Sequence, residues 1–421
     1  MKPKLRFLLP AALFAAGATF AQGPLTPPPG ADPNIGPVNA LTPGGAPQAT
    51  MKTLHQVEPR TAIVAGAPGV TQNANGGYSL AGGGSYYLTG RLVVNSGSGI
   101  IIGGSRVTVD LNGFDIFSGA SGVGGYGVEI NQNAEQVVIK NGIIKSGTTH
   151  SGSAAPYTFT PHGFAVGIGS SGTPKQVTIS ELTISGCAGD GIYVELARVD
   201  HSQAVGCSGT GIRARRIAGC EARENGGDGI IGGAGVCDSV ATANSGTGIS
   251  LYEGMMTDCA AAQNQTGFYA VGGISLSHCT ANRNRFAGFD IDSGTLVGCA
   301  AYLNTYYGFY VRSVSLSSCV ASYNRRAGIH GHELTVSDCT ANDNGEDGVA
   351  ADRDGAGIRA TNSMVKGCNA FRNYQNGIYA PGGFVTACRA GSNSLSGGAG
   401  WSNIFTAADD GWPVGSATNN F

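Results

Sequence analysis

The sequence predicts an all-β solenoid, specifically a single-stranded right-handed parallel β-helix, and its repeats are the main reason. In the stretch 256–344 each repeat has a cysteine, an alanine two residues later and an asparagine five residues later. A glycine and a large apolar residue then follow. A short fixed period marks a solenoid in which each repeat is one coil stacked on the next. The cysteines fall at a constant interval of twenty residues, at Cys259, Cys279, Cys299, Cys319 and Cys339.

The repeat extends over eleven coils between residues 182 and 393. Stacked strands lie ~4.8 Å apart, so that equivalent residues of successive coils are in contact. Asparagines in one column can therefore hydrogen-bond to one another as a ladder, and cysteine can serve as a small buried hydrophobe. The predicted ladder contains Asn225, Asn244, Asn264, Asn284, Asn304, Asn324, Asn344, Asn373 and Asn393.

Two further columns carry large apolar residues that we expect to fill the coil. One follows the repeat glycine, and the other lies three residues before the cysteine position. Together they predict two inward-facing strand segments per coil, joined by tight turns. The strand-crossover rule makes the predicted coil right-handed. The first apolar column runs Ile192, Ile212, Ile230, Ile249, Phe268, Phe289, Phe309, Ile329, Val349 and Ile378.

The two ends of the chain differ from the repeats. Residues 1–21 place Lys2, Lys4 and Arg6 before an apolar run, which predicts a cleaved signal peptide and a secreted or extracytoplasmic protein. Residues 22–50 are rich in proline and predict a linker. We assign residues 51–405 to the β-helix, which begins with a short capping helix after Thr50, and residues 406–421 to an irregular C-terminal cap.

Composition narrows the range of partners. Gly accounts for 70 of 421 residues, only 12% of residues are charged, and the net charge is −2. A chain without a basic field is a poor partner for nucleic acid or an anionic membrane surface. Beyond the leader, no apolar segment is long enough to span a membrane. We therefore expect a monomer whose partner is a polysaccharide or a cell-envelope component.

Early coils are spaced more widely, which predicts inserted loops at about 117–126 and 147–162. The second loop is rich in serine and threonine and carries His150, Tyr157, Phe159 and His162. Long loops on a regular stack often carry function. A disordered insertion is the alternative reading of the same composition.

Eleven cysteines in an exported protein would usually indicate disulfides. Cysteines stacked in one column, however, have parallel Cβ vectors, which suit a disulfide poorly. We predict mostly free, buried thiols. Cys237 falls outside the columns, so that an isolated bridge remains an alternative there. No pair has the CxxC spacing of a zinc site.

The repeats, together with YYLTGRLVV from Tyr86 and VTVDLNGFDI from Val107, resemble the right-handed parallel β-helix proteins of the pectate-lyase-like superfamily. The similarity is to the exported type rich in Gly and Asn and covers roughly Thr61 to Phe405. That superfamily includes polysaccharide lyases, hydrolases, epimerases, phage tailspikes and adhesins. The polygalacturonase-like series Asn-Thr-Asp, Asp-Asp and Gly-His-Gly is absent, as is an Arg-x-Pro-x-x-Arg lyase motif. The resemblance therefore implies the fold and transfers no catalytic residues.

The second and fourth residues after each repeat glycine should face outward, which predicts a polar strip on neighbouring coils. Arg312 could pair with a uronate carboxylate, and His330 or Tyr310 could move a proton in β-elimination or epimerisation. Two carboxylates on one strand could instead be the acid and base of a hydrolase. Salt bridges between coils, without any substrate, are the alternative reading. The candidate residues are Asp290, Asp292, Tyr310, Arg312, His330 and His332, and the strip ends at Asp352.

No cofactor is expected from the sequence. Asp352 and Asp354 form an Asp-x-Asp-Gly fragment that could hold Ca²⁺, but the other ligands of a known loop are missing, and a plain turn is the simpler reading. We therefore expect an exported β-helix scaffold that binds a polysaccharide or cell-surface component. The alternative is a polysaccharide lyase, epimerase or glycoside hydrolase that acts on uronate polymers through the strip from Asp290 to His332.

Overall fold

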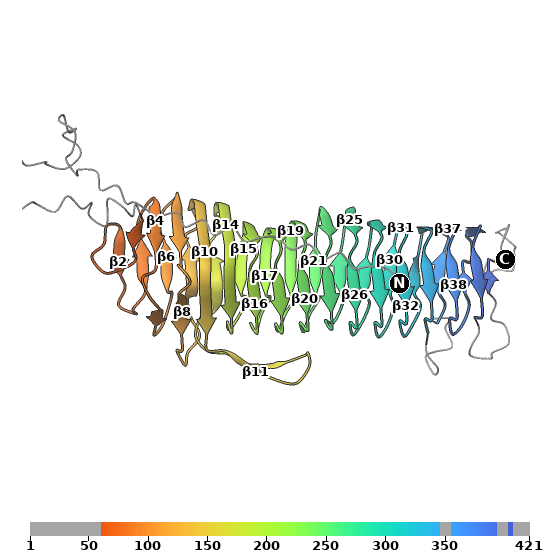
Figure 1. Cartoon of the computed structure of the whole chain (residues 1–421), viewed down its shortest axis with the longest axis horizontal. Helices are drawn as coiled ribbons and strands as arrows, with labels where there is room; N and C mark the ends of the chain where they lie inside the picture. The colour runs from red at the N-terminus through yellow and green to blue at the C-terminus, as the bar shows by residue number, and fades with distance from the viewer. Residues whose placement is uncertain (1–59, 346–354, 394–402, 407–421) are drawn as a thin grey trace, which may run out of the picture. The chain divides into compact units, whose positions relative to one another are not determined.

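The computed structural model describes residues 60–345, 355–393 and 403–406. None of these residues is helical. Strands of each coil pair in parallel with the equivalent strands of the next coil, and coils follow one another in sequence order (Figure 1). The predicted signal peptide, linker and capping helix lie outside the described residues, as does the C-terminal cap apart from Thr406. Within the described ranges no helix is present that could cross a membrane.

Each regular coil has three short strands, whereas the sequence analysis predicted two. The missed segment holds the alanine after each cysteine. It was missed because its inward position carries only this small residue, for example Ala281 or Ala301. The strands of successive coils therefore form three stacks, which we call the first, second and third sheets.

The first sheet begins at the repeat glycines. Three of its members, β15, β17 and β19, continue directly into the second sheet. Its strands are β3 (Tyr78–Leu80), β6 (Ile100–Ile102), β9 (Tyr126–Ile130), β13 (Val166–Ser170), β15 (Ile192–Asp200), β17 (Ile212–Ala218), β19 (Ile230–Cys237), β21 (Ile249–Leu251), β24 (Phe268–Ala270), β27 (Phe289–Ile291), β30 (Phe309–Arg312), β33 (Ile329–His332), β36 (Ile358–Thr361), β39 (Ile378–Tyr379) and β42 (Ile404–Phe405).

The second sheet continues β15, β17 and β19, and its members β10 and β14 run on into the third sheet. Its other strands are β1 (Thr61–Ala62), β4 (Gly84–Tyr87), β7 (Val107–Asp110), β10 (Glu135–Ser146), β14 (Lys175–Ser185), β22 (Met255–Thr257), β25 (Ile274–Ser277), β28 (Gly294–Val297), β31 (Val314–Ser317), β34 (Thr335–Ser337), β37 (Met364–Lys366) and β40 (Phe384–Thr386).

The third sheet precedes the asparagine column. Beside the ends of β10 and β14, its strands are β5 (Leu92–Val94), β8 (Asp115–Ser118), β16 (Gln203–Val205), β18 (Glu221–Arg223), β20 (Val240–Thr242), β23 (Ala260–Ala262), β26 (Thr280–Asn282), β29 (Ala300–Tyr302), β32 (Val320–Ser322), β35 (Thr340–Asn342), β38 (Asn369–Phe371) and β41 (Arg389–Gly391). Near the N-terminus, β2 (Val70–Gln72) pairs antiparallel with β3.

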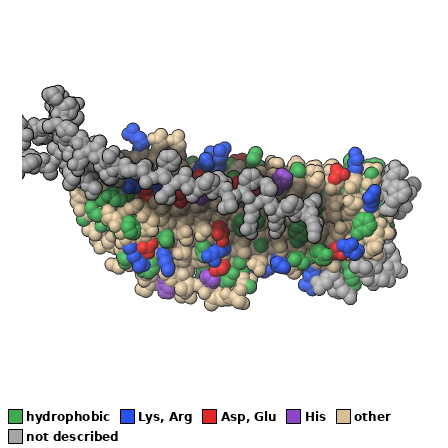
Figure 2. All heavy atoms as spheres, in the orientation of Figure 1, with side chains coloured by type: hydrophobic (Ala, Val, Ile, Leu, Met, Phe, Trp, Pro, Cys, Tyr) green, Lys and Arg blue, Asp and Glu red, His purple; other side chains and the backbone are tan. Residues whose placement is uncertain are grey.

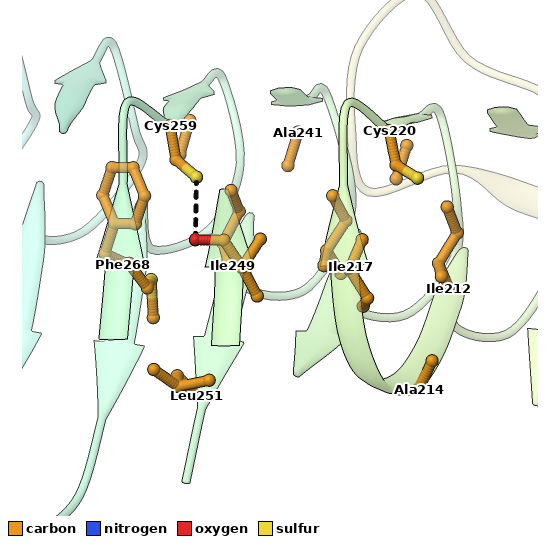
Figure 3. Close-up of a cluster of buried hydrophobic side chains, with 14 of the residues drawn as sticks. Ile212, Ala214, Ile217, Cys220, Ala241, Ile249, Leu251, Cys259 and Phe268 are labelled. Carbon is orange, nitrogen blue, oxygen red and sulfur yellow. Dashed lines mark hydrogen bonds between the residues drawn. The ribbon is translucent and has the colours of Figure 1, made fainter. Parts of the chain in front are cut away.

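The interior consists of the predicted apolar columns. Phe268 pairs in register with Phe289, and Phe289 with Phe309. Their rings stack with centroids 4.8 and 4.7 Å apart, and all three side chains are fully buried. Figure 3 shows the same inward direction for side chains of neighbouring coils, among them Ile212, Ile249 and Phe268, and the bond from the Cys259 thiol to the Val236 carbonyl.

One residue of the first apolar column was assigned wrongly. Ile329 pairs with Ile358, which in turn pairs with Ile378. The column position given to Val349 is therefore occupied by Ile358, and Val349 itself lies outside the described residues. A second glycine followed by an apolar residue, Gly357 and Ile358, restarts the repeat after a longer row.

The asparagine ladder is present as predicted. Oδ1 of Asn304 accepts hydrogen bonds from the backbone N–H and from Nδ2 of Asn284, both at 3.0 Å. Nδ2 of Asn304 donates to Oδ1 of Asn324 at 2.9 Å and to the Ala281 carbonyl at 3.3 Å. Each fully buried amide is thus bonded on both sides, which is what a polar group inside a protein requires.

The ladder also explains why each repeat needs a glycine. A Cβ at Gly288 would lie 2.7 Å from the Gly308 carbonyl oxygen and 2.8 Å from Nδ2 of Asn304. Both neighbours are fixed by the packing of the coils, so that no side chain fits at this position.

All eleven cysteines are free, and ten of them are buried. The stacked thiols hydrogen-bond to nearby backbone, as Cys319 does to the Ser317 carbonyl at 3.4 Å. Cys237 is free as well and is only partly buried, so that the isolated bridge considered for it is absent.

The insertion at 147–162 forms an antiparallel hairpin of β11 (Thr149–Ser151) and β12 (Thr158–Thr160). It leaves the stack and runs beside the turns of later coils (Figure 1). His150 lies 3.5 Å from the Glu224 carboxylate, and the backbone N–H of Tyr157 donates to Ser245 Oγ at 3.3 Å. The insertion is therefore ordered against the coils.

Replacing Asn304 with alanine should lower the free energy of unfolding by about 2–4 kcal/mol, because the amide and N–H of Asn284 lose their buried acceptor. Asn133→Ala, at an exposed asparagine outside the ladder, is the matched control and should change stability by less than about 0.5 kcal/mol. Chemical denaturation followed by circular dichroism measures both. Equal effects of the two substitutions would contradict the role assigned to the ladder.

Thiol titration should distinguish the two classes of cysteine. In the native protein we expect only Cys237 to react with a thiol reagent, since the other ten are buried. After denaturation without reductant all eleven thiols should react. A smaller number in the denatured protein would reveal a disulfide.

Candidate functional site

The outward side chains of four consecutive first-sheet strands lie around one surface groove. In β27, β30, β33 and β36 the register aligns Asp290 with Tyr310, Tyr310 with His330, and His330 with Arg359. A second column aligns Arg312 with His332 and His332 with Thr361. The groove has a volume of ≈ 170 Å³ and is lined by Asp290, Ile291, Asp292, Tyr310, Val311, Arg312, His330, Gly331, His332, Arg359 and Thr361.

The six residues selected from the sequence are therefore brought together. Strand alternation places them, because Phe289 and Ile291 point inward and leave Asp290 between them facing outward. The column nearer the strand starts is half-buried, at Asp290, Tyr310 and His330. The column near the strand ends is exposed, so the groove has a recessed side and an open side.

Arg359 and Thr361 were missed in the sequence analysis. Thr361 occupies the position given to Asp352, because Gly357 rather than Gly348 begins the strand. The signal was present in the sequence as Gly357-Ile358-Arg359, which repeats the glycine and large apolar residue of the earlier coils. Asp352 and Asp354 lie outside the described residues.

Two residues that lie second after a repeat glycine, and are therefore predicted by the same rule to face outward, are buried rather than exposed. Ser250 donates a hydrogen bond to a carboxylate oxygen of Asp228 at 3.2 Å and is 3% exposed. Ile231 is only 6% exposed. Strand alternation thus predicted their direction, but not how their neighbours cover them.

The carboxylates of the groove differ in environment. Burial, and to a lesser extent the negative charge of Asp292, raise the pKa of Asp290 to about 6, although the Arg312 guanidinium opposes the shift. Asp292 lies on the exposed side, where its carboxylate is 3.6 Å from the Arg312 guanidinium. The groove therefore holds one carboxyl group that changes protonation near neutral pH beside one that is paired with a cation.

An aromatic cluster adjoins the recessed side of the groove. It contains Phe286, Tyr306, Tyr307, Tyr310 and His330, mostly from the turns that enter β27 and β30. Tyr307 and Tyr310 stack with centroids 5.3 Å apart, and the Tyr307 ring lies 4.4 Å from that of His330. The Arg326 guanidinium sits 4.3 Å above the Tyr306 ring. These contacts hold Tyr310 and His330 in place where they face the groove.

A metal is not indicated by the described residues, among which no group of three or more His, Cys, Asp or Glu side chains is arranged to hold an ion. On the face displayed in Figure 2, charged side chains form separate spots on a largely uncharged surface.

Residues 235–387 match the family model described as the right handed beta helix region. The chain is a right-handed parallel β-helix. Among curated proteins none matches it in sequence.

Several solved structures are similar to this chain at low identity. The mannuronan C-5 epimerase AlgE4 A-module of Azotobacter vinelandii is 14% identical, with a TM-score of 0.37 over 80% of this chain and 91% of that chain. The periplasmic alginate epimerase AlgG is 12% identical, with a TM-score of 0.38 over 80% of each chain. Tailspike protein 3 of bacteriophage CBA120 is 9% identical, with a TM-score of 0.47 over 80% of this chain and 56% of that chain.

Asp290 should make stability depend on pH. Its pKa is about 6 in the folded protein and 3.8 in the absence of the fold, so folding favours the protonated form. The stabilisation by Asp290 is complete below pH 4 and is lost as the pH rises through 6. We expect Asp290→Asn to be more stable than the wild type at pH 7 by about 1 kcal/mol, a value already reduced for solvent screening, and this advantage to vanish at pH 4.

Denaturation midpoints at pH 4, 5, 6 and 7 provide the test. Glu181→Gln removes an exposed carboxylate outside the groove and controls for the loss of one charge. An advantage of Asp290→Asn that is the same at every pH would show that the carboxyl is not shifted.

Proposed function

We propose that this protein binds an acidic polysaccharide in the groove between Asp290 and Thr361. The observation that carries the proposal is the gathering of Arg312, Arg359 and two imidazoles beside an aromatic cluster in one open groove. Residues 1–21, the predicted leader, would deliver such a protein to polymers outside the cytoplasm.

The side chains of the groove fit an acidic sugar. Guanidinium groups such as those of Arg312 and Arg359 bind carboxylates with charge-assisted hydrogen bonds. Aromatic rings such as Tyr310 present an apolar face to a sugar ring and a hydroxyl to its polar groups. Because the groove is open on its Asp292 side, a polymer can lie across it without threading through a closed pocket.

A second candidate function is catalysis, which the raised pKa of Asp290 favours. A base with a pKa of about 6 can accept a proton at neutral pH, and Asp290 is in register with Tyr310, a hydroxyl donor. With Arg312 or Arg359 on the uronate carboxylate, this set suits proton removal in β-elimination or epimerisation. Asp290 and Asp292 as an acid and base would instead suit glycoside hydrolysis.

A panel of uronate polymers separates binding from catalysis. Unsaturated products are detected by ultraviolet absorbance, and hydrolysis by new reducing ends. Binding of one polymer without turnover supports the binding function alone. If turnover is found, Asp290→Asn and Tyr310→Phe should each reduce it; unchanged rates in both would place the chemistry elsewhere.

Arg312→Gln should weaken binding of the acidic polymer about tenfold, because it removes a charge-assisted contact. Arg389→Gln, at an exposed arginine on the third sheet, should leave the affinity unchanged. Isothermal titration with a size-fractionated polymer measures both. Equal losses for the two variants would indicate attraction by overall charge instead of a site.

A further inference from the structure

A second hollow lies on the first sheet, toward the N-terminal coils. It has a volume of ≈ 340 Å³ and is lined by Glu195, Leu196, Arg213, Arg215, Ala214, Ile231, Gly233, Tyr252 and Glu253. These residues occupy β15, β17, β19 and the two positions that follow β21, whereas the groove at Asp290 begins at β27.

The absence of a side chain at Gly233 creates this hollow. The register aligns Ala214 with Gly232 and Gly232 with Leu251, so that the next residues, Arg215, Gly233 and Tyr252, follow one another on the outer surface. Arg215 and Tyr252 stand on either side of the position where Gly233 contributes no side chain. Ile231 lies beneath them as an apolar floor and is 6% exposed.

The walls combine cationic and apolar groups. The Arg213 guanidinium lies 5.1 Å from the centre of the Tyr193 ring, and its buried Nε has no hydrogen-bond partner in the part of the chain that the structure describes. The Arg215 side chain is exposed. Tyr252 and Leu196, on coils at opposite ends of the hollow, are also exposed, at 58% and 40%, so that each offers apolar surface at its rim.

We infer that this hollow is a second binding subsite for the same acidic polysaccharide, which holds a more distant part of the polymer. The inference rests on the proposed function of the groove. Arg213 and Arg215 would bind a carboxylate, Tyr252 and Leu196 the apolar face of a sugar ring, and Glu195 and Glu253 its hydroxyl groups.

The fold aligns the two sites along one surface. From β17 to β30 the first sheet advances by five coils, through β19, β21, β24 and β27. At ~4.8 Å per coil this separates Arg215 from Arg312 by ~24 Å along the stack. The side chain of Tyr269, 38% exposed, lies on the surface between them.

Two sites of one protein that bind the same polymer molecule at a fixed separation act together. Once the groove holds the polymer, its next segment is at a high effective concentration near Arg215, so that the second contact adds affinity. A short oligosaccharide that reaches only one site gains nothing. The affinity should therefore rise steeply once the ligand is long enough to span both.

The test measures the affinity of two ligands, an acidic polymer and a tetrasaccharide prepared from it. Each ligand is titrated into the wild type, Arg215→Gln, Tyr252→Ala and the control Arg389→Gln. For the polymer, we expect Arg215→Gln and Tyr252→Ala each to weaken binding about tenfold, and for the tetrasaccharide less than twofold. Arg312→Gln should weaken both ligands. Arg389→Gln should change neither.

The outcomes distinguish this inference from the proposed function. If the polymer binds, Arg312→Gln weakens it, and Arg215→Gln and Tyr252→Ala have no effect, the second subsite is refuted and the groove stands. If Arg215→Gln weakens polymer and tetrasaccharide equally, the hollow is not a distant subsite. If no acidic polymer binds to the wild type, both the proposed function and the subsite fail. Circular dichroism of each variant shows that a loss is not due to unfolding.

Discussion

The stacking of identical residues in parallel register is the constraint on which the rest of the structure depends, and the asparagine ladder is where it is strictest. The amide of Asn304 has two N–H donors and one carbonyl acceptor, and all are used by neighbours in adjacent coils. Aspartate would lack the donors, and glutamine would be too long for the same contacts. Because Gly288 and Ala281 surround this amide, their small size follows from the same ladder.

This constraint divides each coil into an inside that repeats and an outside that is free to vary. Phe289 and Phe309 must match because their rings stack at 4.7 Å. Asp290 and Tyr310, one residue further along the same strands, need only be compatible with solvent and with each other. The fold can therefore present a different chemical group on every coil at a spacing of ~4.8 Å, on a backbone whose position the interior determines.

The sequence alone was sufficient to predict those features that are formed by chemically distinctive residues recurring at a regular spacing. The ladder, the phenylalanine column and the outward strip from Asp290 to His332 were all predicted from their spacing. The third strand was not, because a lone inward alanine such as Ala301 gives no apolar pattern to recognise. Corner residues also escaped prediction: Leu303 and Tyr323 have φ values of 56° and 58°, a left-handed conformation that a sequence usually marks with glycine.

Errors at the site had a different cause. The row after His332 is longer than the others, and counting from Gly348 instead of Gly357 moved the predicted strip off its strand. Arg359, which brings a second guanidinium to the groove, was lost by that displacement. Repeats predict the position of a residue in the coil only while the period is constant. Here the insertion could be placed only once the pairing of Ile329 with Ile358 was known.

The chemistry of the outer surfaces argues that the groove has more than a solubilising role. An exposed column of the second sheet beside these coils is uncharged: Thr295 pairs with Ser315, Ser315 with Thr335, and Thr335 with Met364. An outer face of this solenoid therefore does not need charged groups. The first sheet instead places charged groups in the groove, and one of them, Asp290, is buried enough that its ionised form opposes folding. Carboxyl groups with a pKa shifted toward neutrality gather at functional sites, which favours the proposed role of the groove over solubility alone.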